Sequence, residues 1–354
     1  MIQTYSTTIR RKEMDAVLTC MVDEKIGPGE LNSRLTAQVK DFFKCDGSTA
    51  FRSPSIALKY AFQALDVAPG SKIAVSALAP AWQYQAVVSM NMVPVVLDVR
   101  EETGLVPYDA LQKAVLDGVK VILLHETEGI LPDAAELEEI CKLGIPVIED
   151  ISMSAGASVA QKDENGNELP RKKAGLFGVF TILGLEERDV ITAGGGAVLM
   201  APGRREWIVL KKFSDEAPLT DLLPDINAAL AWVQLKEFNR NETARKEIFN
   251  LYHHSCLIGR HKMLVREMDE GSTMSCFPLV LSSAFKDVKQ YASKKDIEIR
   301  PAYEGSIIEL KMEELSESCI KAKSLLLRTA HFPLYPRLTH SESAKISKVL
   351  GTLP

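Results

Sequence analysis

The sequence predicts an α/β protein built on a mostly parallel sheet and followed by a smaller α+β domain. From about residue 50, short apolar runs alternate with amphipathic stretches of helical period. This alternation is typical of βαβ units, whose parallel strands are covered by helices on both faces. After about residue 255 the strands alternate with fewer helices, and a length of 354 residues suits about two domains. We therefore expect a large domain of residues 1–245 and a small domain of residues 246–354.

The first of the alternating elements is a helix that begins at Ser53. Serine is a good N-cap residue, and Pro54 follows it at the first helical position, where proline is favoured. Apolar residues at helical spacing come next. The turn at residues 68–70 ends this predicted helix.

Four apolar runs then predict the strands of a parallel sheet, at residues 73–75, 93–97, 119–124 and 145–148. Helical stretches lie between these runs, at residues 107–116 and 133–143. Farther along, the polar residues 161–173 predict a hairpin, and residues 225–253 predict one long helix with core-like apolar spacing. The predicted domain boundary falls inside or just after this long helix.

The composition is that of an ordinary globular protein without a strong charge bias. Lys and Arg number 42 against 47 Asp and Glu, and the formal net charge is −5. A nucleic-acid or polybasic membrane partner is therefore not indicated. The six cysteines are scattered with no C-x-x-C pair, which favours reduced cytosolic thiols over a disulfide framework or a zinc site.

Targeting and membrane segments are not predicted either. Residues 1–17 lack the apolar run of a secretory signal. Residues 73–97 carry no charged side chain, but Pro80, Gln83 and Pro94 interrupt the apolar run. We expect a strand–helix–strand unit there, no membrane span, and a cytoplasmic location.

Four polar side chains lie at or just beyond the carboxyl ends of predicted strands, namely Asp98, His125, Glu149 and Asp150. Ligands of open α/β sheets bind at this edge. Asp150 ends a buried strand, where a carboxylate can hold a protonated ring nitrogen or a metal ion. Solvation of the strand end or capping of a helix is the alternative interpretation. For His125, a satisfied buried histidine is the default.

Four further features allow both a functional and a structural interpretation. The helix start at Ser53, with Arg52 beside it, could bind an anion through its free N–H groups, although most helix starts bind only water. Trp82 could stack on a ring or lie in the core. The glycines at residues 194–196 do not have the spacing of a dinucleotide or Walker loop. The adjacent histidines at residues 253–254 face different sides of a helix, so no metal site is predicted there.

Six stretches carry a family resemblance: SPSIALKYAFQALDVAPGSKIAV, MVPVVLDV, IPVIEDISMSAGASV, AGLFGVF with GGGAVLM, INAALAWVQLKEF with Arg245 and Tyr252 downstream, and the ending LLLRTAHFPLYPRLT. In their order and spacing they resemble the DegT/DnrJ/EryC1/StrS family of nucleotide-sugar aminotransferases. The resemblance covers about residues 40–350. It implies an aspartate-aminotransferase-like (fold type I) scaffold with a three-layer large domain and the cofactor pyridoxal phosphate (PLP). It also implies a nucleotide-sugar ligand and a homodimer with the site at the subunit interface.

The resemblance assigns cofactor contacts position by position. Asp150 matches the aspartate that holds the pyridinium nitrogen, and Met153 stands where the family has Gln or His near the ring. The family's Ser-Gly-Thr phosphate cup becomes Ser53, Pro54 and Ser55. Because proline has no N–H, one backbone donor to the phosphate is lost.

Three other positions also depart from the family pattern. The aromatic residue that stacks on the ring falls at Pro80 by ungapped counting, with Trp82 two residues farther on. The phosphate-binding serine falls at Gly184. An asparagine that reaches over from the partner subunit falls near Thr220.

The lysine position is the decisive departure. The family forms its internal aldimine with a lysine shortly before the glycine-rich loop. Here that position falls at Asp189, or at Arg188 if the register slips by one, and no lysine lies between Lys173 and Lys211. An aspartate cannot form an imine, and its negative charge competes with the cofactor phosphate for positive groups.

We therefore expect a protein that is degenerate for transamination, with a binding, scaffolding or regulatory role in nucleotide-sugar or polysaccharide biosynthesis. Such a protein holds PLP or pyridoxamine phosphate (PMP) non-covalently or holds no cofactor. The alternative is an active enzyme with non-covalent PLP or PMP and Asp189 as the base; the family's sugar 3-dehydratases similarly work with a histidine in place of the lysine. A third hypothesis keeps only a nucleotide-sugar or anion site at residues 52–55.

Overall fold

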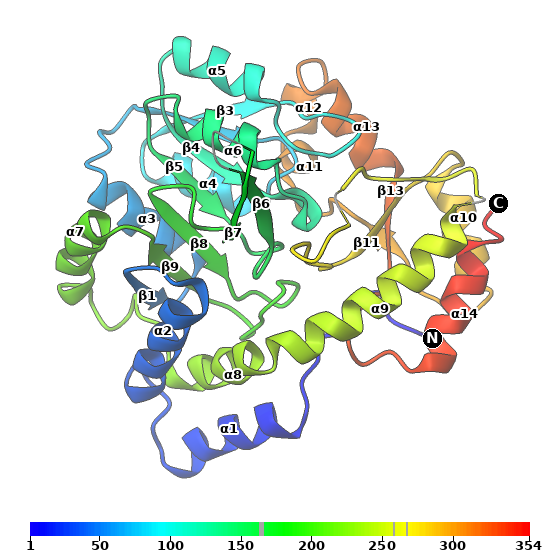
Figure 1. Cartoon of the computed structure of the whole chain (residues 1–354), viewed down its shortest axis with the longest axis horizontal. Coiled ribbons are helices and arrows are strands. Elements are labelled where there is room, and N and C mark those ends of the chain that lie inside the picture. Colours follow the sequence, from blue (N-terminus) through cyan, green and yellow to red (C-terminus); the bar gives the residue numbers. More distant parts are fainter. Residues whose placement is uncertain (163–165, 258, 267) are drawn as a thin grey trace.

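A seven-stranded mixed sheet forms the centre of the larger part of the molecule (Figure 1). The structure is a computed structural model that describes residues 1–162, 166–257, 259–266 and 268–354. In spatial order the strands are β1 (Gly47–Phe51), β9 (Ala197–Ala201), β8 (Phe180–Gly184), β5 (Val147–Asp150), β4 (Val119–His125), β2 (Lys72–Ser76) and β3 (Val93–Leu97). Strand β9 runs antiparallel to β1 and β8, and the other pairings are parallel. The predicted mostly parallel sheet is confirmed.

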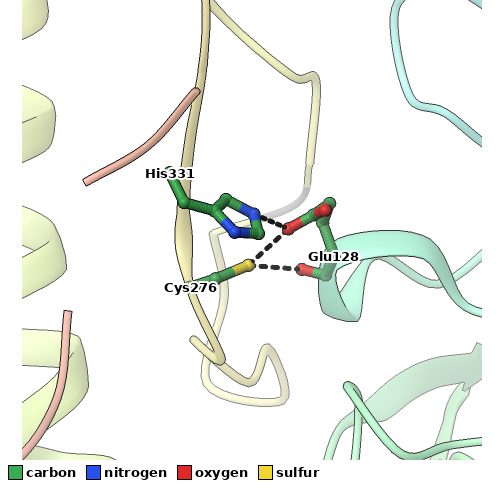
Figure 2. A group of neighbouring side chains, drawn as sticks. All are labelled: Glu128, Cys276 and His331. Carbon is green, nitrogen blue, oxygen red and sulfur yellow. Dashed lines mark hydrogen bonds and ion pairs between the residues drawn. The ribbon is translucent and has the colours of Figure 1, made fainter. Parts of the chain in front are cut away.

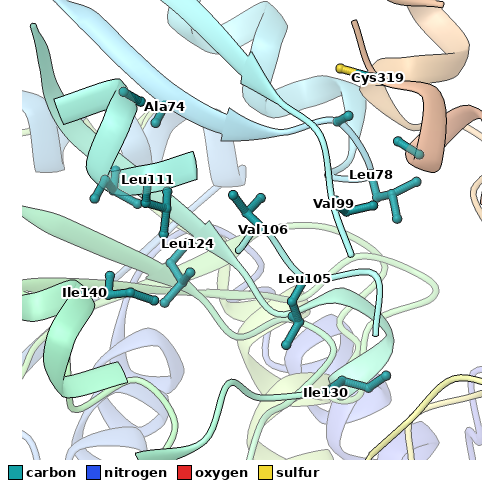
Figure 3. Close-up of a cluster of buried hydrophobic side chains, with 14 of the residues drawn as sticks. Ala74, Leu78, Val99, Leu105, Val106, Leu111, Leu124, Ile130, Ile140 and Cys319 are labelled. Carbon is teal, nitrogen blue, oxygen red and sulfur yellow. The ribbon is translucent and has the colours of Figure 1, made fainter. Parts of the chain in front are cut away.

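Helices cover both faces of this sheet, because successive side chains of a strand point to opposite faces. Ile73 and Val75 pack under one group of helices, whereas Ala74 packs under the other group. The first face carries α3 (Pro54–Ala64), α4 (Ala81–Ser89) and α7 (Arg204–Asp215). The second face carries α5 (Tyr108–Leu116), α6 (Ala134–Cys141), α2 (Glu30–Phe43) and α8 (Asp225–Lys236). Figure 3 shows part of the core beneath α5 and α6.

The smaller sheet comes later in the chain and is antiparallel throughout. Its order is β10 (Lys262–Met263), β11 (Phe277–Val280), β13 (Thr329–Phe332) and β12 (Arg300–Pro301). A separate core joins this sheet to α9 (Phe238–Cys256), α10 (Phe285–Ser293) and α14 (His340–Leu350). The predicted boundary between residues 245 and 246 lies within the continuous helix α9, and it stays a prediction.

Two shorter regions connect these parts. Helix α1 (Arg11–Val22) packs on α8 at the edge of the large sheet's layers. After β12, the chain forms α11 (Ile307–Leu310), α12 (Met312–Leu315) and α13 (Ile320–Arg328). Leu325 of α13 joins the core of the large sheet near Leu78, so the later part of the chain is anchored to the earlier part.

The prediction of one helix over residues 225–253 is wrong in detail. Two helices, α8 and α9, are separated at Glu237, whose φ and ψ of −91° and 7° depart from helical values. Phe238 then packs edge-on against Phe42, with 5.2 Å between the ring centroids. Apolar spacing continues across a break of a single residue, so periodicity alone could not reveal it.

Other expectations agree with the structure. Ser53 caps α3, with Pro54 at its first position. The predicted hairpin is formed by β6 (Ser158–Lys162) and β7 (Glu168–Lys173), while residues 163–165 of that prediction lie outside the described residues. Residues 73–97 form β2, α4 and β3. Within the described ranges, no helix has the length and apolar character needed to cross a bilayer.

Candidate functional site

A cavity of about 240 Å³ lies between the carboxyl edge of the large sheet and the smaller sheet. The ends of β4 and β5 contribute His125 and Ser152 to its wall, and the start of α4 contributes Trp82. Cys276 and His331 line it from the smaller sheet's side. Parallel strands end together at this edge, which is where open α/β sheets bind ligands.

Asp150 lies beneath the cavity, and both of its carboxylate oxygens accept hydrogen bonds from the chain itself. Oδ2 accepts from Gln83 Nε2 at 2.8 Å and lies 3.1 Å from His125 Nδ1. Oδ1 accepts from the backbone N–H of Ser152 at 3.1 Å and from its hydroxyl at 2.5 Å. Burial raises the pKa of Asp150, but the hydrogen bonds and charge of His125 and the bonds from Ser152 outweigh burial, so the pKa is lowered. Asp150 is therefore an ionised carboxylate with its oxygens already occupied.

The other two strand-end carboxylates bind backbone groups. Glu149 points to the opposite face of the sheet from Asp150 and accepts three backbone N–H bonds, at 2.5–2.9 Å, from the loop at residues 175–178. Asp98 accepts the backbone N–H groups of residues 321 and 322, at the start of α13. For these two residues the structural interpretation holds, because each satisfies backbone donors that would otherwise lack partners.

Asp189 lines the cavity from the loop that follows β8. Its Oδ2 accepts the backbone N–H of Glu186 at 2.7 Å. Burial, only partly offset by that hydrogen bond and reinforced by the nearby charge of Asp150, raises the pKa of Asp189 to about 8. A Cβ atom added to Gly184 would overlap Asp189 Oδ2 and would lie 2.5 Å from Ser152 Oγ. The space for a larger residue at Gly184 is therefore already filled.

The start of α3 uses its serine for capping. The Ser53 hydroxyl accepts the backbone N–H of Ile56 at 3.2 Å, and Pro54 lines the cavity. Ser55 is half-buried. Of the predicted site residues, the structure brings Trp82, Met153 and Asp189 to the cavity wall, with Asp150 directly beneath. Ser53, Ser55 and Gly184 are not among the described residues that line it, and Thr220 is exposed.

Sequence reasoning missed a second buried group at the same cavity. Glu128 sits in a short turn, η1 (Thr127–Gly129), with a φ of +56°. Its Oε2 lies 2.6 Å from Cys276 Sγ and 2.6 Å from His331 Nε2, and Figure 2 shows the three side chains pointing toward one another. Tyr5 places its hydroxyl 2.7 Å from His331 Nδ1. These partners lie 148 and 203 residues from Glu128 in the chain, so no local motif could have indicated the group.

Electrostatically, the cavity wall is acidic. Its acidic residues are Glu128, Glu186, Asp189 and Glu304, against a single arginine, Arg188, and no lysine is among the described lining residues. Arg188 lies 3.5 Å from Glu304 and stacks over the ring of Tyr5. Burial raises the pKa of Glu128, but the charge and hydrogen bond of His331 outweigh burial, so that pKa is lowered. The cavity thus offers carboxylates and ring nitrogens, which suit cationic ligands better than anionic ones.

Comparison with known sequences gives two findings. The sequence profile of the DegT/DnrJ/EryC1/StrS aminotransferase family matches residues 7–351. An L-glutamine:2-deoxy-scyllo-inosose aminotransferase of Streptomyces kanamyceticus is 25% identical over 170 residues, which are 48% of this chain and 38% of that protein. The match therefore spans less than half of this relative's length.

Comparison with solved structures identifies the fold. An aminotransferase, TlmJ, from Streptoalloteichus hindustanus superposes with a TM-score of 0.85 at 16% identity, covering 99% of this chain and 98% of that one. GDP-4-keto-6-deoxymannose-3-dehydratase with a trapped PLP-glutamate geminal diamine gives a TM-score of 0.82 at 17% identity, covering 99% and 100%. The predicted fold type I scaffold is confirmed by these similarities. Since the family profile spans nearly the whole chain, this protein belongs to the DegT/DnrJ/EryC1/StrS aminotransferase family.

Proposed function

We propose that this protein does not catalyse ordinary transamination and instead has a binding, scaffolding or regulatory role in nucleotide-sugar or polysaccharide biosynthesis. The feature that carries the proposal is Asp189, which the family resemblance aligns with the lysine position. Asp189 lines the cavity, and no lysine is among the described residues around it. Without a lysine there, the described part of the cavity wall offers no side-chain amine with which to form an internal aldimine.

The phosphate end of PLP does not fit the residues present. A phosphate group carries nearly two negative charges and requires donors or cations. Here Ser53 caps its own helix, Pro54 offers no N–H, and the carboxylate of Asp189 occupies the space beside Gly184. The carboxylates of Glu128, Glu186 and Glu304 in the wall add repulsion.

The ring nitrogen of the cofactor lacks a free acceptor at Asp150. In this family the strand-end aspartate is expected to accept the pyridinium N–H. The oxygens of Asp150 already accept from Gln83 and Ser152 and lie beside His125, so a ring nitrogen would have to displace one of these partners. PLP supplies an electron sink when bound to a protein, but the residues of this chain do not fit it and we derive no step through it.

An active enzyme with non-covalent PLP or PMP is the second candidate function. Two observations favour it. Asp150 is ionised, and Asp189, with a pKa of about 8, would be close to the ideal for a general base near neutral pH. The cofactor-bound structures of related folds, such as the dehydratase with PLP-glutamate, make PLP a reasonable ligand to test.

An absorbance scan of the purified full chain, with added PLP or PMP and before and after borohydride, separates the two candidates. The proposed function predicts no saturable cofactor band and no fixation by borohydride. A bound cofactor that resists borohydride fixation would overturn the proposal and support the second candidate. A lysine-linked chromophore would contradict the placement of Asp189 at the lysine position.

Restoration of the lysine is a sharper test. We expect that Asp189→Lys combined with Pro54→Gly still binds no PLP, because the losses extend to Gly184 and to the saturated Asp150. Asp189→Arg with Pro54→Gly is the matched control, since it carries the same charge and cannot form an imine. An aldimine band in the lysine variant alone would show that the pocket is otherwise intact.

We also propose that the protein is a homodimer, that it binds a nucleotide-sugar ligand, and that it is cytoplasmic. Helix α1 and the residues after it support the dimer, because they expose several large apolar side chains: Met14, Leu18, Met21, Val22 and Ile26. Sedimentation of the wild type is expected to give a dimer, and Leu18→Glu is expected to shift it toward monomer. Thr19→Glu, on a different side of α1, is the matched control and should leave the mass unchanged.

A further inference from the structure

Three side chains from distant parts of the chain converge on one point at the cavity. Glu128, Cys276 and His331 each offer one ligand atom, and these atoms all lie within 4.8 Å of one another. The exposed fractions of the three residues are 5%, 6% and 4%. Figure 2 shows the sulfur of Cys276 and the ring nitrogen of His331 both directed at the carboxylate of Glu128. We propose that this group is a binding site for a divalent transition-metal ion, with Zn²⁺ as the best match.

The identity of the ligand atoms points to zinc. Thiolate, imidazole and carboxylate are its common protein ligands, and Zn²⁺ accepts them in a flexible tetrahedral arrangement. Hard ions such as Mg²⁺ and Ca²⁺ prefer all-oxygen sites and would not favour a sulfur ligand. Three protein ligands leave a fourth position free, which is the pattern of an open rather than a closed zinc site.

Two tyrosines near the cluster support the proposal. Tyr5 lies 2.7 Å from His331 Nδ1, which fixes the ring and leaves Nε2 directed at the cluster. Tyr303 lines the same cavity, is 4% exposed, and its hydroxyl has no hydrogen-bond partner within the described part of the chain. A buried hydroxyl without a partner is costly, and a fourth ligand on the metal would give it one.

The charges of such a site balance. On binding, the S–H bond of Cys276 and the Nε2–H bond of His331 break, sulfur–metal and nitrogen–metal bonds form, and both protons leave to solvent. One thiolate and one carboxylate then neutralise the two charges of the ion. Arg266 donates to the backbone oxygen of Glu128 and not to its carboxylate, so the carboxylate remains available to the metal. This proposal revises the sequence-based expectation of no metal site.

Cobalt is the probe for the first test, because its absorption reports both geometry and sulfur ligation. The full chain, stripped with a chelator, is titrated with Co²⁺. We expect one Co²⁺ per chain, with visible bands of a tetrahedral site and a sulfur-to-cobalt charge-transfer band in the near ultraviolet, both abolished by Zn²⁺. A chain that binds no Co²⁺ at stoichiometric concentration would overturn the proposal and leave a purely hydrogen-bonded cluster.

Variants assign the ligands. Cys276→Ser is expected to lose the charge-transfer band completely, whereas Cys141→Ser, a matched control at a cysteine outside the cluster, keeps it. Tyr5→Phe is expected to keep the band but to weaken Co²⁺ affinity about 10- to 100-fold, since the tyrosine only orients His331. An unchanged band in folded Cys276→Ser would place the metal elsewhere and contradict the proposal.

A measurement on the unaltered protein covers the case in which Cys276→Ser does not fold. Addition of Zn²⁺ to weakly buffered protein should release about two protons per chain, because both the thiol of Cys276 and Nε2 of His331 must lose a proton to bind the ion. The same ion should also raise the melting temperature of the wild type. Zinc binding with no proton release would exclude Cys276 as a ligand and overturn the proposed site.

Discussion

Asp150 and Glu128 are two buried carboxylates beside one cavity, each within hydrogen-bond distance of a histidine, yet their surroundings differ. The partners of Asp150, which are Gln83, His125 and Ser152, all come from the large sheet's strands, its helix α4 and the loop after β5. Glu128 is instead met by residues of the smaller sheet's side of the cavity. All of these Asp150 partners therefore belong to the large sheet and its connections, whereas Glu128 lies between the large sheet and the smaller sheet.

The difference indicates where a ligand can enter. A carboxylate whose oxygens are shared among internal donors can accept a ligand only by losing one of those hydrogen bonds. Glu128, Cys276 and His331 line the cavity, and their ligand atoms lie within 4.8 Å of one another. Asp150 is therefore the more closed of the two carboxylates.

Of the substitutions that test this comparison, removal of the Asp150 carboxylate is expected to change the free energy of unfolding most. Asp150→Ala leaves the side chains of Gln83 and Ser152 without their acceptor. We expect a loss of about 3–5 kcal/mol in the free energy of unfolding, measured by urea denaturation. The exposed Glu313→Ala is the control and should change stability by about 0.5 kcal/mol or less. An equally small effect at Asp150 would mean that its network is not structurally important.

A serine at Gly184 tests whether the space beside this residue is filled. Gly184→Ser places atoms against Asp189 and Ser152, and we expect a loss of about 1–3 kcal/mol. Asp189→Ala should relieve part of this loss, so the two substitutions should be non-additive in a double-mutant cycle. Strict additivity would show that Asp189 does not occupy the space beside Gly184.

The pH dependence of stability tests the burial of Asp189. Its folded pKa of about 8 exceeds the value of about 4 in an unfolded chain, so the folded state binds the proton more tightly. The stability that this group contributes is therefore complete below pH ~4 and is lost as the pH rises through about 8. Asp189→Asn should remove this pH dependence. Above pH ~8 it should stabilise the protein by about 1–2 kcal/mol, which is less than the full pKa shift implies because solvent screens the partly exposed side chain. Parallel pH profiles of the two proteins would contradict the raised pKa.

The smallest expected effect concerns the start of α3. Ser53→Ala removes the N-cap hydrogen bond to Ile56 and should cost about 1 kcal/mol, measured by thermal unfolding. Ser55→Ala, two residues farther on, is the matched control and should cost about 0.5 kcal/mol or less. Similar losses at both positions would indicate that the serines share a role other than capping.

Much of the fold could be predicted because its signals are local. Short apolar runs indicated β2 to β5 within two residues, and Ser53 with Pro54 indicated the start of α3, although α3 ends at Ala64, before the predicted turn at residues 68–70. The break at Glu237 could not be predicted, because a one-residue interruption leaves the helical period intact. For the site, strand ends indicated Asp150 and His125, but not the partner Gln83, which α4 brings from the neighbouring strand unit.

The sequence by itself determined the α/β class, the family resemblance and the aspartate at position 189, since each depends on residue identity and short-range order. Only the tertiary structure decided that the oxygens of Asp150 are occupied, that Asp189 fills the space beside Gly184, and that Glu128 meets Cys276 and His331. The physical reason is distance along the chain. These contacts join segments whose packing depends on how two sheets and their helices come together, and no local pattern encodes that arrangement.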